Sequence, residues 1–346
     1  MRRAICATAR TLRFVLPALA VAATFATSAP SASAGPRFVV VEENDALASQ
    51  RDYGYTQGLR ASLVFDMPAA GSGHTAFDIF GGFLFAPDGA AQRQIEWIMI
   101  GQSIFTPADK ALVRPDPFDR PYAAWLYTGV SLAQETARGQ LDSFEILAGV
   151  VGPSALGRQV QNSFHSMQGG SMQALGWDYQ LRDRPALLVA WDRRWKFGFT
   201  AVNDFGIDVI PSIGVTLGNV YTYASAGGMV RFGRSLSSTW GPTRVRPAYS
   251  GASFFTPTNT GDFGFAFFAG AHGRAVGRNV FLDGSTFTNG PPLDSRTFVA
   301  DFAVGAEVFS NAGSRLAVSV TRRTEEFRNQ PGNGDLFGAV EMNVRF

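Results

Sequence analysis

Cysteine is almost absent from the sequence: the 346 residues contain one, Cys6. It lies in an N-terminal segment with a basic start, an apolar run over residues 14–25 and the small-residue motif Ala32-Ser33-Ala34. This order is typical of a secretory signal peptide, so we expect residues 1–34 to be cleaved off. The apolar run has 12 residues, too few to cross a bilayer as a helix. The expected mature chain, residues 35–346, has no thiol, which excludes disulfides, thiolate metal sites and cysteine nucleophiles.

The expected mature chain also lacks an excess of positive charge. Loss of residues 1–34 removes four arginines and no acid, which leaves 26 Lys and Arg residues against 28 Asp and Glu, a net charge of about −2. Nucleic-acid binding thereby loses its main electrostatic support. No mature stretch reaches 18 consecutive apolar residues, so we expect no helical membrane span.

Glycine and aromatic residues, in contrast, are abundant. The sequence has 38 glycines and 30 phenylalanines, with only 17% charged residues. This composition fits a β-rich protein, either a water-soluble sandwich or a transmembrane barrel.

Alternation of side-chain type favours the barrel over the sandwich. In residues 335–346 one face is mostly aliphatic, whereas the other carries Asp335, Glu341 and Arg345. Residues 297–308 and 55–66 alternate in the same way over ten residues or more. That length suits a tilted membrane strand. A face with charge and glycine suits a barrel lumen, and the opposite face would meet lipid.

The pattern therefore predicts one all-β domain over residues 35–346, an antiparallel transmembrane β-barrel of about twelve strands. Segments 67–91 and 233–262 are less regular, and each could hold a further strand. The last residue, Phe346, is aromatic, and in this the chain resembles bacterial outer-membrane barrels. The predicted strands are 38–43, 54–66, 92–104, 121–135, 139–151, 184–197, 203–217, 219–232, 263–276, 295–309, 313–325 and 335–346.

An even number of strands brings remote segments to one mouth of the barrel. With both termini in the periplasm, the loops after odd-numbered strands face outside: 44–53, 105–120, 152–183, 218, 277–294 and 326–334. The first three hold most of the unusual polar residues, together with the adjoining strand ends: Glu43, Asn44, Asp45, Thr56, Lys110, Asp119, Arg120 and His165. This convergence is what an active site needs and a plain pore does not.

Each of these candidates has a structural and a functional interpretation. His165, in the loop sequence QNSFHSMQGGSMQALGWDYQL, is either a surface residue or a catalyst. Asn44 and Asp45 either form a turn or supply oxygen ligands to a hard cation such as Ca²⁺. Thr56 falls on the predicted lumen face, so we expect its hydroxyl to point inward. Asp119 and Arg120 could form a local salt bridge.

Familiar hydrolase signatures are missing. The sequence contains no G-x-S-x-G elbow, no H-E-x-x-H zinc motif and no glycine-rich phosphate loop between a strand and a helix. His74 and His272 lie in segments without a motif, and we expect both to be structural or solvated.

Four blocks of the sequence resemble the lipid A 3′-O-deacylase (LpxR) family of outer-membrane proteins. They are VEENDALASQRDYGYTQGLRASL, IGQSIFTPADK with DRPYAAWLYTG, VGPSALGRQVQNSFHSMQGGSMQALGWDYQL, and TRRTEEFRNQPGNGDLFGAVEMNVRF. The blocks occur in family order and span nearly the whole mature chain. The resemblance implies a twelve-stranded barrel in the bacterial outer membrane that removes the 3′-linked acyloxyacyl group of lipid A in a Ca²⁺-dependent reaction. It also implies a site on the outer side, between the barrel wall and an external loop.

The family's site residues can be placed on this chain one by one. The resemblance puts its Asn-Asp pair on Asn44 and Asp45, as metal ligands, and its strand Thr on Thr56. Its essential His falls on His165. The family has a Glu six residues after that His, but this sequence has Ser171 there.

Two further residues could take part in such a site. Glu43 is a candidate for the acid that Ser171 does not supply, and Lys110 is a loose match to a family lysine. The implied chemistry is ester hydrolysis, in which His165 takes a proton from the attacking water and Ca²⁺ stabilises the oxyanion. The implied partner is lipopolysaccharide of the outer leaflet.

Two other functions remain open from the sequence. One is a catalytically inert, porin-like barrel, which the missing Glu would suit. The other is an outer-membrane phospholipase, but that family uses an H-x-S-N-G motif, whereas His165 here is followed by Ser166-Met167-Gln168.

Overall fold

The computed structural model describes residues 35–49, 54–67, 90–167, 174–200, 204–247, 253–256, 263–284, 293–310 and 313–346. The predicted signal peptide lies outside the described residues, as do His74 and nearly all of segment 67–91. Within the described part of the chain, no helix has the length and apolar character needed to cross a membrane.

Most of the described chain is β-structure. The strands are β1 (Arg37–Asn44), β2 (Gly54–Met67), β3 (Ala90–Thr106), β4 (Ala123–Thr136), β5 (Gln140–Val151), β6 (Arg184–Trp195), β7 (Phe197–Thr200), β8 (Phe205–Gly218), β9 (Tyr221–Arg234), β10 (Phe263–Asn279), β11 (Phe298–Ser310), β12 (Arg315–Arg323) and β13 (Leu336–Arg345). The helical segments are short: η1 (Asp45–Leu47), η2 (Pro153–Ala155), α3 (Gly157–Met167), η3 (Gly176–Tyr179), η4 (Leu236–Ser238), α4 (Val280–Asp283) and η5 (Pro331–Asn333).

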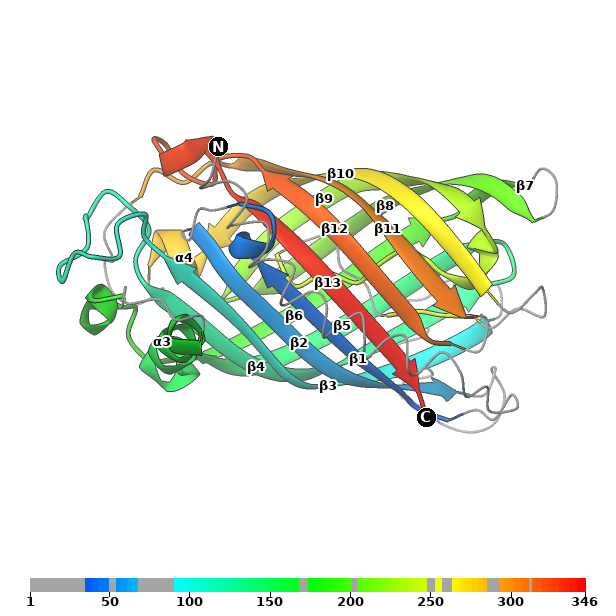
Figure 1. Ribbon diagram of the computed structural model, residues 1–346, viewed down its shortest axis with the longest axis horizontal. Helices are drawn as coiled ribbons and strands as arrows, with labels where there is room; N and C mark the ends of the chain where they lie inside the picture. Colours follow the sequence, from blue (N-terminus) through cyan, green and yellow to red (C-terminus); the bar gives the residue numbers. More distant parts are fainter. Residues whose placement is uncertain are drawn as a thin grey trace, which may run out of the picture. The chain divides into compact units, whose positions relative to one another are not determined.

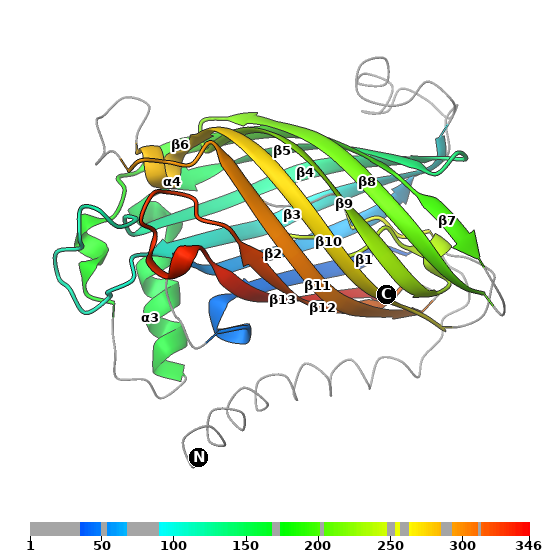
Figure 2. The same cartoon turned by 90° about the horizontal axis from the view of Figure 1, so that it is seen from above.

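The strands form one antiparallel sheet that closes into a barrel (Figures 1 and 2). β1 pairs with β13, and β6 pairs with β8, which closes the sheet. Only Lys196 separates β6 from the short β7, and both pair with successive parts of β8. They occupy one position in the wall, so the predicted twelve-stranded barrel is confirmed. The described residues between β9 and β10 add no further strand, only η4 and an isolated bridge from Thr239 to Phe255.

The wall has two chemically different faces, as the alternation predicts. On β8, Ile207, Val209 and Ile213 are exposed on the outside, whereas Asp208 and Ser212 between them are buried inside. The other strands repeat this arrangement, with large apolar side chains outside and charged ones inside. This is the reverse of a water-soluble protein and fits a wall that faces lipid.

A segment between β9 and β10 runs through the lumen. We call its described residues, 235–247 and 253–256, the inner strap. The Arg244 side chain in the strap donates from Nε to Glu43 on β1 at 2.5 Å and from Nη1 to Thr321 on β12 at 2.8 Å. The backbone N–H of Thr243 donates to Glu341 on β13 at 2.7 Å. The strap is thus hydrogen-bonded to several strands of the barrel wall.

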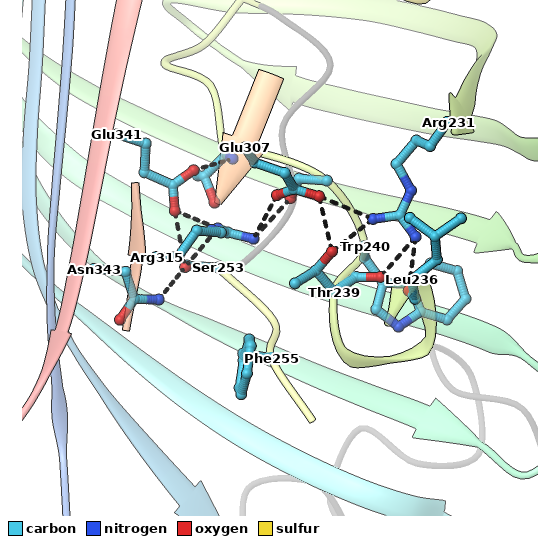
Figure 3. Close-up of polar contacts among 12 residues, drawn as sticks. Arg231, Leu236, Thr239, Trp240, Ser253, Phe255, Glu307, Arg315, Glu341 and Asn343 are labelled. Atoms are coloured by element: carbon cyan, nitrogen blue, oxygen red, sulfur yellow. Dashed lines mark hydrogen bonds and ion pairs between the residues drawn. The ribbon is translucent and has the colours of Figure 1, made fainter. Parts of the chain in front are cut away.

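Figure 3 shows how the strap and the wall share their charges. Thr239 and Arg231 both donate to Oε1 of Glu307, at 2.9 Å and 3.1 Å. Arg315 pairs with Glu341, and Ser253 of the strap bonds to both of them. These groups lie in the interior, where a charge without a partner is costly.

Arg246 of the strap joins two strands of the wall. Its guanidinium donates to Glu145 on β5 at 2.5 Å and to Asp192 on β6 at 2.8 Å. Arg60 on β2 binds the other oxygen of Glu145 at 2.9 Å. All four side chains are largely buried, so removal of one partner leaves charge that water does not solvate.

We therefore expect Arg246→Ala to lower the free energy of unfolding by about 3–5 kcal/mol. The matched control is Arg328→Ala, because Arg328 pairs with Asp294 in an exposed contact at 2.9 Å, and loss of such a contact costs at most about 1 kcal/mol. Unfolding of the barrel in detergent can be followed on gels, because the folded and the heat-denatured chain migrate at different rates. Equal stability losses in the two variants would contradict this account of the lumen.

Candidate functional site

The excursions between strands gather at one end of the barrel, where α3, α4, η1 and η5 all lie (Figures 1 and 2). Contacts between remote segments confirm this arrangement. Gln102 at the end of β3 donates to the carbonyl of Ala155 in η2 at 2.6 Å. Arg120, before β4, donates to Glu326, after β12, at 2.7 Å. The predicted convergence of loops at one mouth is therefore confirmed for the described residues.

On the lumen side of this mouth, aromatic rings pack into a buried cluster. Phe105 of β3 stacks on Phe281 of α4 with ring centroids 4.2 Å apart. Tyr55 of β2 contacts Phe105 at 5.5 Å and Phe337 of β13 at 5.0 Å. We call this group, with Trp125 and Tyr221, the mouth cluster.

On the outer side, the excursion between β5 and β6 folds back over the wall. Ile104, Tyr122 and Ala124 of β3 and β4 form a buried apolar cluster with Ala155 and Trp177 of this excursion. The alternate residues of the same strands, including Phe105, point into the mouth cluster. The two clusters thus identify the two faces of the wall at this end.

Helix α3 is held close to that outer wall. The Trp177 indole donates to Oε1 of Gln161 in α3 at 2.9 Å. Gly157 approaches so closely that a Cβ there would lie 2.5 Å from Cβ of Ala124 and 2.7 Å from the Trp177 ring. The first turn of α3 therefore requires glycine, because a side chain would push the helix away from the wall.

Thr56 lies on the outer face, so the prediction that its hydroxyl points into the lumen was wrong. The β2–β3 register shifts between Tyr55 and Gln57, which is a β-bulge. The Tyr55 ring fills the lumen, and Thr56 bonds to Thr106 with their hydroxyl oxygens 2.8 Å apart. Thr106 shares the outer face with Ile104 by alternation. One extra residue in the strand has moved Thr56 to the opposite side.

Asn44 ends β1, and its side chain begins η1. Its Oδ1 accepts the backbone N–H of Ala46 at 2.8 Å, which is the turn-forming role expected of Asn. Asn44 pairs with Gln57 on one side and Gly338 on the other, on the outer row of the wall. Asp45 follows it and is 3% exposed.

Glu43 faces the wrong way to serve this outer site. Its Oε2 accepts the Tyr55 hydroxyl at 2.9 Å, and its Oε1 accepts Arg244 Nε at 2.5 Å and the Val245 N–H at 3.2 Å. These partners lie in the lumen, on the opposite face from Asn44. The interpretation of Glu43 as the missing acid is therefore wrong.

Glu42 is the carboxylate on the outer row, and the sequence reasoning overlooked it. It lies one position before Glu43, and its side chain is hydrogen-bonded to those of Asn44 and Gln57. Alternation along the predicted strand 38–43 already contained the signal, since Glu42 shares its face with Phe38 and Val40.

These residues define a polar group on an otherwise apolar wall: Glu42, Asn44, Thr56, Gln57, Gln102 and Thr106. We call it the outer-wall patch. Its oxygen donors, with Asp45 beside it, have the chemistry that suits a hard cation. Within the described ranges, no group of three His, Cys, Asp or Glu side chains could hold a metal ion. A cation here would therefore depend on amide and hydroxyl oxygens as well as carboxylates.

Asp119 and Arg120 do not form the expected local salt bridge. Asp119 accepts backbone N–H groups at 2.6 Å and 2.7 Å, one of them that of Arg120. The Arg120 guanidinium instead pairs with Glu326 and lies 3.7 Å from Asp335. Burial raises the pKa of Asp335 to about 6 against the attraction of Arg120. Burial also opposes ionisation of Glu326, but Arg323 and Arg120 outweigh it and lower its pKa.

Lys110 is buried in the external loop and connects it to the outer excursion. Its carbonyl accepts the N–H of Leu175 at 3.0 Å and the Tyr122 hydroxyl at 3.5 Å. Its main chain therefore fixes the loop against the segment that carries η3. His272, on β10, is buried in the lumen, which agrees with its expected structural role.

His165 lies in α3, one turn after Gln161. The side chain of His165 and residue Ser171 lie outside the described residues. The structure therefore places the helix that carries His165 against the outer wall, and the role of the imidazole stays a prediction.

Comparisons with known proteins agree with this architecture. A family model described as "Outer membrane protein LpxR" matches residues 12–346. LpxR from Salmonella typhimurium has a similar structure, with a TM-score of 0.70 and 21% sequence identity over 90% of this chain and 100% of that chain. The β domain of the Bordetella autotransporter BrkA matches with a TM-score of 0.44 and 12% identity over 90% of this chain and 99% of that chain. No curated protein sequence matches the chain. The family match covers the whole barrel, and the chain belongs to the LpxR family of outer-membrane proteins.

Proposed function

We propose that this protein is a carboxylic ester hydrolase that removes the 3′-linked acyloxyacyl group from lipid A in the outer leaflet. The observation that supports this most is the outer-wall patch, which lies on the outside of the barrel at the mouth where α3 packs. Asn44, Thr56, Gln102 and Thr106 of this patch are buried on the outside of a wall that is otherwise mostly apolar, and polar groups in such a position are unfavourable unless they have a function. A site in that position meets its substrate within the membrane, as a lipid hydrolase requires.

The proposed reaction uses water as the nucleophile. His165 takes a proton from the water as it attacks the ester carbonyl, because an unperturbed imidazole is largely neutral near pH 7. Asn44 and Asp45 would hold Ca²⁺, and the bound ion supplies electrostatic stabilisation of the developing oxyanion. Thr56, bonded to Thr106, presents its hydroxyl in the same patch. Helix α3, which packs on this wall, would bring His165 to the patch.

The first test is His165→Ala in the purified, folded barrel. Loss of a general base costs about 10²–10⁴-fold in rate, so we expect mass spectra of lipid A to show deacylation reduced at least about 100-fold. Ser163→Ala is the matched control, because Ser163 is an exposed residue of the same helix. Unchanged deacylation in the His165 variant would refute this assignment. Acyl release from phosphatidylethanolamine but not from lipid A would favour a phospholipase.

The second test displaces α3 without changing the patch. Gly157→Leu places a side chain where Ala124 and Trp177 already lie. We expect deacylation to fall by about 10²-fold, because small misplacements of a catalytic group cost that much. The barrel's unfolding temperature should change little, since the strand pairings of the wall are kept. Ser163→Leu, on the exposed side of the helix, should retain activity, and loss of activity in both variants would contradict the role of helix position.

A porin-like function is disfavoured by the contents of the lumen. The aromatic mouth cluster lies buried at the outer end, and the described residues of the inner strap are hydrogen-bonded to the lumen side of the wall. In planar bilayers we expect no open-channel steps comparable with those of a general porin measured in parallel. Stable steps of that size from the wild-type barrel would favour the porin interpretation.

A further inference from the structure

Glu42 occupies an unusual position for a carboxylate. On β1, Val39, Val41 and Glu43 are buried in the lumen, so Glu42 is on the outward row with Phe38 and Val40. Its neighbours across the sheet are apolar: Leu59 on β2 and Val340 on β13. An acidic side chain on a lipid-facing row is unfavourable, which makes its presence a functional signal.

On the lumen side of the wall, the negative charge of acidic side chains is neutralised by arginines. Glu43, the next residue, pairs with Arg244, and Glu145 pairs with both Arg60 and Arg246. Glu42 instead is hydrogen-bonded to the side chains of Asn44 and Gln57, which carry no charge. These amides can orient the carboxylate, but they do not neutralise it.

The geometry of Asn44 shows which of its atoms serves Glu42. Its Oδ1 already accepts the N–H of Ala46 at 2.8 Å. Its Nδ2 group is therefore the donor available to the carboxylate of Glu42. A carboxylate has about four acceptor positions, so these two amides leave it capacity to bind a cation.

We propose that Glu42 supplies a carboxylate ligand to a hard divalent cation at the outer-wall patch, beside Asn44 and Asp45. A Ca²⁺ ion has the charge that the uncharged amides lack, and it prefers carboxylate and amide oxygens. Its binding neutralises Glu42 and so accounts for a carboxylate on the lipid-facing row. This inference rests on the proposed function, because it assigns a ligand in the same site.

The experiment measures cation binding directly on the folded, detergent-solubilised full barrel. Ca²⁺ titration calorimetry and Tb³⁺ luminescence are compared for the wild type, Glu42→Gln and Glu42→Asp. We expect Glu42→Gln to weaken binding about tenfold or more and Glu42→Asp to weaken it less, because Asp keeps the charge. Glu325→Gln is the control: Glu325 follows β12 and pairs with Arg296, which is not a residue of the patch.

Folding of each variant is checked by its heat-modified gel mobility, and the rise in unfolding temperature on addition of Ca²⁺ gives a second readout. We expect Ca²⁺ to stabilise the wild type and the Glu325 variant but not Glu42→Gln. Wild-type affinity in a folded Glu42→Gln barrel would overturn the proposal, and so would the absence of Ca²⁺ binding to the wild type at millimolar concentration. If Glu42→Gln did not fold, Glu42→Ala would take its place, and wild-type Ca²⁺ affinity in that folded variant would also overturn the proposal.

Lipid A mass spectra from the same preparations separate this inference from the proposed function. If the wild type deacylates lipid A and Glu42→Gln leaves Ca²⁺ binding unchanged, the proposed hydrolase function is supported and Glu42 is not a ligand in its site. If Ca²⁺ binding depends on Glu42 but the wild type does not deacylate lipid A, Glu42 is a ligand and the proposed hydrolase function is refuted.

Discussion

Pairing of buried charges across the lumen is the interaction on which the rest of the structure depends. Arg60 joins Glu96 and Glu145, and Arg246 joins Glu145 to Asp192, with N–O distances of 2.5–2.9 Å. These contacts link β2, β3, β5 and β6 to the inner strap. Because each charge depends on its partner for solvation, the interior has one satisfactory arrangement. These side chains occupy the lumen, so the proposed site lies on the outside of the wall.

The outside of the wall has the opposite design. Large apolar side chains cover most of it, and polar groups gather where β1, β2 and β3 reach the mouth. A single bulge in β2 makes this possible, because it brings Thr56 to the same side as Thr106 while Tyr55 stays in the lumen. Helix α3 and the Trp177 segment then cover the neighbouring wall. The proposed lipid hydrolase thus works on the membrane side of a barrel whose interior is a support.

Much of this could be predicted from the sequence, and the errors share one cause. The twelve strands and their convergence at one mouth follow from period-two alternation and an even strand count. The face of Thr56, the role of Glu43 and the partner of Arg120 were predicted wrongly or incompletely. Each depends on a register shift or on a residue far away in the chain: Arg244 for Glu43 and Glu326 for Arg120. Local sequence carries no signal for such partners.

The sequence by itself determined the architecture, because alternation of apolar and polar side chains is a local property that only a barrel wall between lipid and lumen satisfies along the whole chain. Tertiary structure alone decided which partners the acids next to Asn44 meet. Glu42 and Glu43 are adjacent in the chain and chemically alike, yet the pleat of β1 sends one to the outer wall and the other to Arg244. The bulge, the inner strap and the position of α3 are likewise set by contacts between distant segments, which become defined only when the sheet closes.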